Sequence, residues 1–164
     1  MEVSELDSGR PALRSERVDV RTFIEALLRR KRLSASIEGP DVQISTDMAR
    51  LERILGNLVE NAHEHGEGRD VKISISDEPS GCRVTVSDRG PGIAAGDLPK
   101  LFRRFYKPDR SRTRERGGVG LGLAIAQENA KLLGGGIEVS STPGAKTEFT
   151  LRLPSLAEQR QPAR

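Results

Sequence analysis

The sequence predicts an α+β fold: a two-layer α/β sandwich in which a mixed, mostly antiparallel sheet packs against about three helices. Two pairs of segments, 71–76 with 82–87 and 137–141 with 147–153, alternate apolar and polar residues with the period of two that strands show. Apolar residues at helical spacing predict longer helices. The order of these elements does not follow the strict βαβ alternation of a doubly wound fold.

The composition indicates a globular domain and excludes several classes of function. The 164 residues are 31% charged and 35% hydrophobic, and neither a membrane-length apolar stretch nor a signal-peptide pattern occurs. The one cysteine, Cys82, cannot form an internal disulfide, which suits a reducing cytoplasm. With 3% aromatic residues, base-stacking contacts to nucleic acid are not expected. The net charge of +3 and the pI of 9.3 leave binding of a polyanion as an alternative.

Both ends of the chain are expected to lie outside the folded domain. Residues 1–17 begin a helical pattern that stops at the Ser-Gly-Arg-Pro stretch 8–11, so we expect a linker or the end of an upstream helix. The polar residues 155–164 are expected to form a disordered tail. The domain is therefore predicted to span residues 18–154.

The first half of this domain contains helices and short strands. Residues 21–32 place apolar side chains on one helical face and end in a cationic turn, which suits a helix C-terminus. Segments 34–37 and 42–45 are expected to be short strands around a Gly-Pro turn. Asp47 is well placed to cap the helix 48–65.

A glycine-rich segment leads into the helix predicted over 120–133. No glycine precedes a lysine, which excludes a Walker loop, and the GxGxG spacing differs from the GxGxxG of a Rossmann fold. Glycines let backbone N–H groups approach a ligand, and a helix start offers unpaired donors, so the segment predicts an anion site. The alternative is a flexible loop whose glycines only cap helices and turns. Five cationic residues precede the glycines: Lys107, Arg110, Arg112, Arg114 and Arg116.

A second glycine-containing turn follows a predicted strand directly. Asp88 ends the strand, and the sequence continues with Gly90, Pro91 and Gly92. A carboxylate at a strand end can accept a hydrogen bond from an exocyclic amine such as that of adenine. The alternative is an ordinary Asp-Gly turn.

Two asparagines share one face of the helix 48–65. Asn57 and Asn61 are four residues apart, and asparagine is a poor helix former, so the pair suggests a function. Their amide oxygens suit a hard cation such as Mg²⁺, while capping or exposure to solvent is the alternative. His63 and His65 cannot converge on a metal, because residues two apart lie about 200° around a helix.

In this order, the motifs resemble those of the ATP-binding catalytic domain (HATPase_c) of bacterial sensor histidine kinases, in the GHKL superfamily. The resemblance covers roughly residues 18–154 and implies a Bergerat-type sandwich. The F box contains Phe102 and Phe105, which are expected to anchor the base of an ATP lid. The five matching boxes are the N box at 57–62, the G1 box at 88–93, the F box at 101–106, the G2 box at 117–125 and the G3 box at 144–154.

The resemblance implies a role for each matching residue. Asp88 would accept the adenine amine, with Thr147 supporting it through a water molecule. Asn61 would bind Mg²⁺, and Asn57 would lie close to the same metal–phosphate cluster, so these two are the expected catalytic positions. The other expected nucleotide contacts are His65, Gly90, Gly92, Ile93, Lys107, Arg112, Gly118, Gly120, Leu121 and Gly122.

The sequence also departs from the family pattern at four positions. Glu64 stands where a basic residue is usual, and His65 stands where an aromatic residue commonly stacks on adenine. Val119 replaces a small residue, and Lys146 replaces a glycine of the last box.

The implied activity is that of a protein-histidine kinase in two-component signalling, which transfers the γ-phosphoryl group of MgATP to a histidine. Hydrolysing relatives of the gyrase type have a water-activating glutamate four residues before the metal asparagine, whereas this chain has Asn57. Transfer is therefore favoured over hydrolysis. The alternatives are a degenerate ATP-binding regulatory module and a serine kinase of the anti-sigma-factor type.

The implied partners follow from the same resemblance. No phosphoacceptor histidine box occurs in the chain, so the acceptor is expected on a separate dimerisation domain. A cognate response regulator is the next expected partner. The full-length protein is expected to be a membrane-bound homodimer with this domain in the cytoplasm, and this fragment is expected to be soluble and monomeric.

Overall fold

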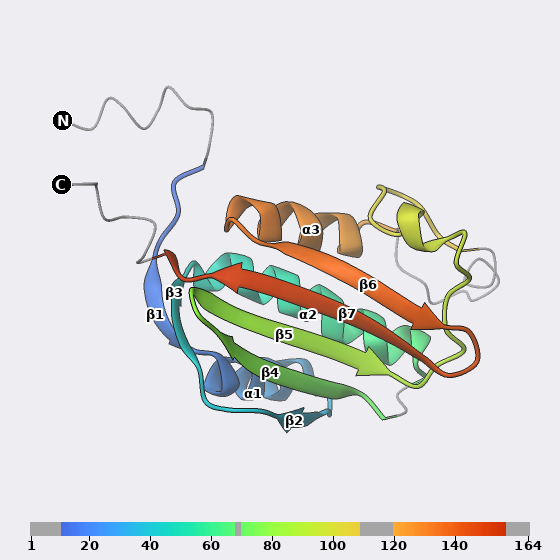
Figure 1. The fold of residues 1–164 in the computed structure, drawn as a ribbon, viewed down its shortest axis with the longest axis horizontal. Helices are drawn as coiled ribbons and strands as arrows, with labels where there is room; N and C mark the ends of the chain where they lie inside the picture. Colours follow the sequence, from blue (N-terminus) through green and yellow to red (C-terminus); the bar gives the residue numbers. More distant parts are fainter. Residues whose placement is uncertain (1–10, 68–69, 109–119, 157–164) are drawn as a thin grey trace.

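The structure, a computed structural model, describes residues 11–67, 70–108 and 120–156 (Figure 1). In chain order its elements are β1 (Glu16–Asp19), α1 (Val20–Lys31), β2 (Ser36–Glu38), β3 (Gln43–Thr46), α2 (Met48–His65), β4 (Lys72–Glu78), β5 (Gly81–Asp88), the 3₁₀ helix η2 (Leu98–Lys100), α3 (Gly122–Leu132), β6 (Gly136–Thr142) and β7 (Lys146–Pro154).

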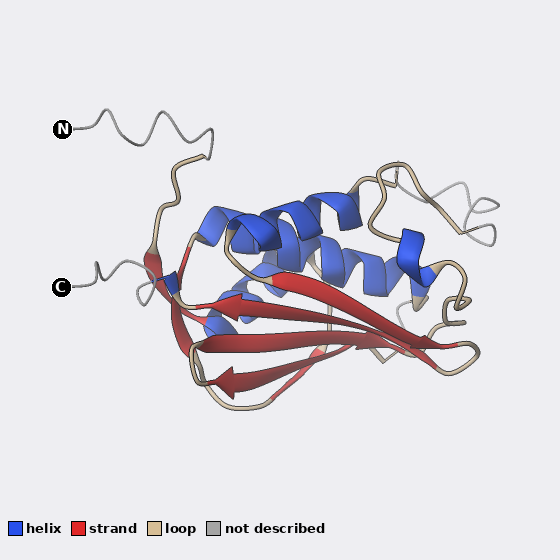
Figure 2. Cartoon of the chain, turned by 45° about the horizontal axis from the view of Figure 1, so that its top comes forward, coloured by secondary structure: helices blue, strands red, loops and turns tan. Residues whose placement is uncertain are grey.

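These elements form two layers, with the helices covering one face of the main sheet (Figure 2). The main sheet has five strands in the order β2-β4-β5-β7-β6, while β1 and β3 form a separate two-stranded sheet. Among the described strands, β2 pairs with β4 in parallel, and the other neighbouring strands are antiparallel. The predicted mixed, mostly antiparallel sheet packed against three helices is confirmed.

Helix α2 crosses the middle of the helical layer and is fixed at its start. The Asp47 side chain accepts a hydrogen bond from the Arg50 N–H at 3.1 Å, which caps the helix. The other carboxylate oxygen accepts the Arg14 N–H at 3.0 Å, so the segment entering the domain is tied to the same cap. One face of the helix is buried and apolar, with Leu51, Ile54, Leu55, Leu58 and Val59 at helical spacing.

The core lies between the two layers. Alternate residues of the central strands point into it, among them Ile73, Val84 and Phe149. Cys82 is buried among them, and burial raises the pKa of its thiol to about 12. The thiol is therefore protonated at neutral pH and acts as an apolar core residue.

Helix α3 is attached to both its neighbours by side-chain amides. Gln127 donates to the Ile137 carbonyl at 3.1 Å and accepts the Ile137 N–H at 2.9 Å, so it satisfies both backbone groups at the edge of β6. On the other side, Asn129 accepts a hydrogen bond from Arg50 of α2 at 2.9 Å. These bonds fix the position of α3 relative to the sheet and to α2.

The structure differs from the expected domain ends. Residues 16 and 17, expected in the linker, belong to β1, which pairs with β3. With four residues and one buried apolar side chain, Val18, this strand has too short a pattern to detect from sequence. At the other end, Leu156 is 4% exposed and Ser155 accepts the Ser45 N–H, so these two residues pack on the domain.

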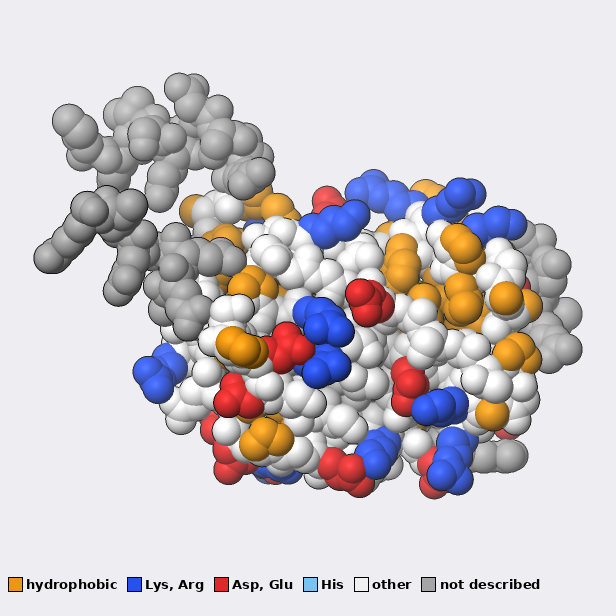
Figure 3. All heavy atoms as spheres, viewed as in Figure 1, with side chains coloured by type: hydrophobic (Ala, Val, Ile, Leu, Met, Phe, Trp, Pro, Cys, Tyr) orange, Lys and Arg blue, Asp and Glu red, His pale blue; other side chains and the backbone are white. Residues whose placement is uncertain are grey.

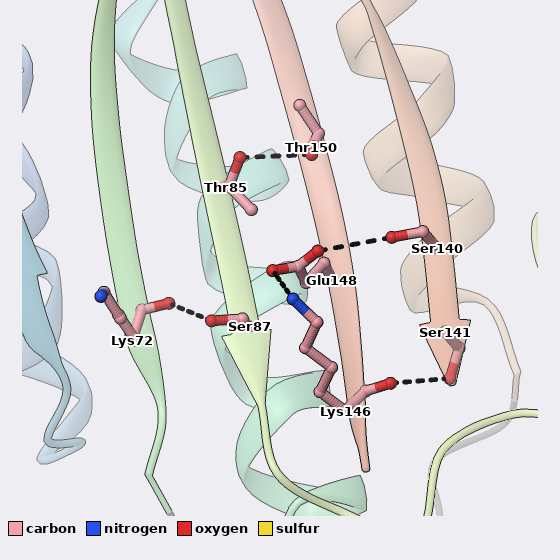
Figure 4. A network of polar contacts seen from close by, with 8 residues as sticks. All are labelled: Lys72, Thr85, Ser87, Ser140, Ser141, Lys146, Glu148 and Thr150. Atoms are coloured by element: carbon pink, nitrogen blue, oxygen red, sulfur yellow. Dashed lines mark hydrogen bonds and ion pairs between the residues drawn. The ribbon is translucent and has the colours of Figure 1, made fainter. Parts of the chain in front are cut away.

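The open face of the sheet is polar and pairs its own charges. Figure 3 shows acidic and basic side chains interspersed over this face. The ion pairs include Lys72 with Glu38 and Lys146 with Glu148. Hydroxyl side chains fill the space between them, and a close view shows Thr85 paired with Thr150 (Figure 4). Within the described residues, none of the helices has the length and apolarity needed to cross a membrane.

Candidate functional site

The predicted site residues gather at one end of the sandwich. The end of β5, the last turns of α2, the turn between β6 and β7 and the start of α3 all lie at the right of Figure 1. Asp88 ends β5, Asn61 lies in the last turns of α2, Thr147 lies at the start of β7, and α3 begins at Gly122. Segments that are far apart in the sequence thus bring the N, G1, G2 and G3 boxes together.

Asp88 is a buried carboxylate at the end of β5. It is 3% exposed, and its Oδ1 accepts the Gly90 N–H at 2.8 Å. Burial raises the pKa of Asp88, whereas the Gly90 hydrogen bond and the nearby His65 charge lower it. In the described part of the chain, no donor bonds its Oδ2. That oxygen can accept a hydrogen bond from a ligand.

The turn after Asp88 is clamped against two neighbouring segments. A methyl group on Gly90 would lie 2.5 Å from the His65 carbonyl oxygen, and one on Gly92, whose φ is +75°, would lie 2.7 Å from Thr142. The Ile93 N–H donates to the Ser141 hydroxyl at 2.8 Å. Glycine is thus required at both positions, and the turn forms a rigid floor beside Asp88.

The two asparagines of α2, Asn57 and Asn61, lie four residues apart and therefore on the same face of the helix. Asn57 donates from Nδ2 to the Arg53 carbonyl at 2.7 Å, so its Oδ1 points away from that bond. This oxygen faces the start of α3, because a methyl group on Gly122 would lie 2.9 Å from it. Asn61 is half-buried and has no hydrogen bond to the described residues. Neutral oxygen donors of this kind fit Mg²⁺ together with phosphate oxygens.

The start of α3 has the features of an anion site. Asp side chains cap α1 and α2, whereas the N-cap of α3, Leu121, makes no side-chain capping bond in the described structure. Its first N–H groups and the positive end of the helix dipole are therefore available to an anion. Gly120 precedes it with a φ of +79° and lies against the Phe105 backbone, which fixes how the loop enters the helix.

Of the two phenylalanines in the F box, one packs its side chain on the domain and the other is held by its backbone. Phe102 packs edge-to-face on Phe149 of the core, with ring centroids 6.3 Å apart. Phe105 does not anchor the segment through its ring, which is 68% exposed. Instead its N–H donates to the Gly120 carbonyl at 2.9 Å, and its φ of +64° is a strained conformation for this residue type. The expected anchoring role thus fits the ring of Phe102 only.

For several expected site residues the structure gives fewer contacts, and some of them lie outside the described residues. Arg112 and Gly118 fall within 109–119, which the structure does not describe. Lys107 is half-buried near the base of that segment. His65 is exposed at the end of α2 and near enough to Asp88 for its charge to lower the carboxyl pKa. Lys146 pairs with Glu148 on the open face, at 2.9 Å.

A groove in the helical layer includes only part of the candidate site. A groove of about 610 Å³ runs between α2 and α3, and it contains Asn57 and Asn129 but neither Asp88 nor Asn61. The candidate site is marked by the buried Asp88 and Thr147 together with the half-buried Asn57 and Asn61, and not by this groove.

Ser141 is a further residue at this end of the sandwich, and the sequence alone does not indicate it. Its hydroxyl lies 2.9 Å from the Thr147 hydroxyl and accepts the Ile93 N–H, so it links β6, β7 and the turn after Asp88. The only signal in the sequence is a Ser-Ser pair in an alternating strand, which does not show which serine faces the site.

Known proteins resemble the chain in sequence and in fold. Residues 46–157 match the family model described as histidine kinase-, DNA gyrase B- and HSP90-like ATPase. The sensor histidine kinase MtrB of Mycolicibacterium paratuberculosis is 37% identical over 163 residues, covering 94% of this chain and 29% of that protein. The chain thus spans less than a third of the curated relative's length.

Two solved structures share the architecture. The mycobacterial sensor histidine kinase MprB has a TM-score of 0.73 and 25% identity, covering 87% of this chain and 98% of that one. Full-length ShkA in complex with AMPPNP has a TM-score of 0.76 and 26% identity, covering 93% of this chain and 33% of that one. The ordered boxes, the sandwich and these matches lead to one assignment. The chain belongs to the family of histidine kinase-, DNA gyrase B- and HSP90-like ATPases, as an ATP-binding domain of the bacterial sensor histidine kinase type.

Proposed function

We propose that the chain binds MgATP at this end of the sandwich and transfers the γ-phosphoryl group to a histidine on a separate dimerisation domain. Asp88 accepts the adenine amine, Asn61 holds Mg²⁺ beside Asn57, and the start of α3 binds the phosphates. The acceptor domain belongs to the same membrane-bound homodimeric protein, whose kinase domain is cytoplasmic, and the cognate response regulator is a separate partner protein.

One observation carries this proposal. A buried carboxylate with an available oxygen, two amide oxygens and a helix start without a side-chain cap lie at the same end of the sandwich. The three groups match the three parts of MgATP: the base, the metal and the phosphates. The solved relative ShkA, which was crystallised in complex with the ATP analogue AMPPNP, supports the same choice of ligand.

Phosphoryl transfer is favoured over hydrolysis because of Asn57. Its Nδ2 is used in the bond to Arg53, and the remaining amide oxygen is too weak a base to take a proton from water. Transfer needs positioning and neutralisation of charge more than a protein base, and bound Mg²⁺ supplies part of that neutralisation. An imidazole acceptor is itself a nucleophile.

The binding step is tested by calorimetry with ADP and GDP in the presence of Mg²⁺. We expect saturable binding of ADP and weaker binding of GDP. The change Asp88→Ala leaves the adenine amine without its acceptor and is expected to cost about 1–3 kcal/mol of binding free energy. Asp77→Ala is the matched control, because Asp77 is exposed near the other end of the β4–β5 hairpin. Equal affinity for the two nucleotides would contradict the assignment of Asp88.

A further inference from the structure

Ser141 on β6 bonds to three residues, one in the turn after Asp88 and two at the start of β7. Its Oγ lies 2.8 Å from the Ile93 nitrogen, 3.0 Å from the Lys146 carbonyl oxygen and 2.9 Å from the Thr147 Oγ1. The bond to Lys146 is visible at the end of the β6–β7 hairpin (Figure 4). Ser140, the preceding residue, points to the opposite face and bonds Glu148.

These three contacts determine the direction of each proton. The Ile93 N–H can only donate and the Lys146 carbonyl can only accept, whereas each hydroxyl has one proton and two lone pairs. When Ser141 donates to Lys146, its lone pairs are left for Ile93 and for Thr147. The Thr147 hydroxyl must then donate to Ser141, and its own oxygen is left as an acceptor only.

The oriented Thr147 hydroxyl lies beside the carboxylate of Asp88. The two residues are directly opposite each other on β7 and β5, so their side chains project from the same face. They are 4% and 3% exposed, which removes most competing water. A ligand edge that meets two acceptors here must bring donors.

We propose that Ser141 is a positioning residue that sets the selectivity for the purine base. It does so by fixing the Thr147 hydroxyl in the orientation in which its oxygen is an acceptor beside Asp88. The inference rests on the proposed nucleotide site. A 6-amino purine brings the two N–H donors of its amine to this edge. A 6-carbonyl purine instead brings an oxygen whose lone pairs face the two acceptors, and its one remaining donor there is the N1–H. Without Ser141, the Thr147 hydroxyl is free to turn and to donate to a carbonyl.

The test compares ADP with IDP, in which a carbonyl replaces the 6-amine, by calorimetry with Mg²⁺. The change Ser141→Ala is expected to reduce the ratio of the two affinities about tenfold, which equals about 1.4 kcal/mol. Ser141→Thr restores a hydroxyl and is expected to keep the ratio. Ser140→Ala is the matched control, because that hydroxyl lies on the open face.

A double-mutant cycle with Thr147→Val separates positioning from a structural role. Valine has the shape of threonine without the hydroxyl, so in this background Ser141→Ala should no longer change the ADP-to-IDP ratio. The inference is wrong if Ser141→Ala weakens both nucleotides equally, or if it changes the ratio as much in the Thr147→Val background as in the unchanged chain. If the unchanged chain binds ADP and the ratio stays constant in Ser141→Ala, this inference fails while the proposed function stands. If the unchanged chain binds neither nucleotide, both fail.

Discussion

At the scale of single residues, Asp88 is a site residue whose ionised side chain lowers the stability of the fold. Burial disfavours the ionised form of Asp88 and raises its pKa above 3.8, although the Gly90 N–H and the His65 charge act in the opposite direction. A group with a raised folded-state pKa contributes stability that is fully present below its unfolded pKa and is lost as the pH rises through the folded value. At neutral pH the ionised Asp88 therefore opposes folding, as is common for groups kept for function.

This balance predicts opposite effects of Asp88→Asn on folding and on binding. Asparagine can still accept the Gly90 N–H, so the melting temperature at pH 7 is expected to stay equal or rise in thermal unfolding. The affinity for ADP is expected to fall, because an amide oxygen is a weaker acceptor than a carboxylate.

In the unchanged chain, ADP affinity should decline as the pH falls through the raised pKa of Asp88, with a midpoint above 3.8. A large loss of melting temperature, or a midpoint at the ordinary value, would contradict this account.

The sequence indicated some of these residues but not how they are connected. Asp88 and Asn61 stand out in the sequence because their side-chain types are unusual in their places, an acid at a strand end and an amide on a helix. Ser141 could not, since its bonds depend on the register of β6 against β7, which places it beside Thr147. The exposed ring of Phe105 was also not foreseen, because its place depends on the backbone bond to Gly120.

At the scale of elements, the sequence pattern predicts an element correctly when the capping residue, the apolar face and the end of that element all lie within one short segment. Helix α2 has the predicted bounds of Met48–His65, because Asp47 caps it and the apolar stripe is unbroken. The hairpins β4–β5 and β6–β7 also form as predicted, since each is closed by a short turn. The pairing of β1 with β3 was missed, because it joins two short strands across the whole of α1.

The contact between α2 and α3 gives a prediction at this scale. Asn129 is 5% exposed, accepts from Arg50 at 2.9 Å and donates to the Ile125 carbonyl at 2.9 Å. Asn129→Ala leaves the Arg50 guanidinium without this partner in a largely buried place. We expect a loss of about 1–3 kcal/mol in the free energy of unfolding, measured with urea. Glu128→Ala, at the exposed neighbouring position, should change it by at most about 0.5 kcal/mol. Equal losses would show that the Asn129 bond contributes little.

At the scale of the whole molecule, the fold separates stability from function. The open face of the sheet is polar and pairs its own charges, and the opposite face is covered by helices. The available polar groups of the proposed site lie at one end, where the strands and α2 finish. In the proposed function, the domain that supplies the phosphoacceptor approaches this end.

The histidines of the chain are poorly placed to be that acceptor. The sequence contains two, His63 and His65, both close to Asn61 on α2. His63 is held by its Nε2, 2.8 Å from the Ser34 carbonyl oxygen, and His65 lies beside Asp88 at the end expected to bind adenine. In-line attack on the γ-phosphate requires an imidazole that approaches to about 3–3.5 Å with aligned orbitals. Residues fixed on the same rigid helix as Asn61, the proposed metal ligand, cannot make that approach.

We therefore expect no self-labelling when the chain is incubated alone with radiolabelled ATP and Mg²⁺. Hydrolysis should also be slow, because Asn57 cannot activate water. When the helical dimerisation domain of the full-length protein is added, acid-labile label should appear on that domain. It should disappear when the acceptor histidine of the added domain is changed to glutamine. Asn61→Ala in this chain should abolish the transfer, whereas Asp77→Ala should not. Efficient labelling of the chain alone, or fast release of phosphate without the added domain, would instead indicate an autonomous ATPase or another phosphotransferase.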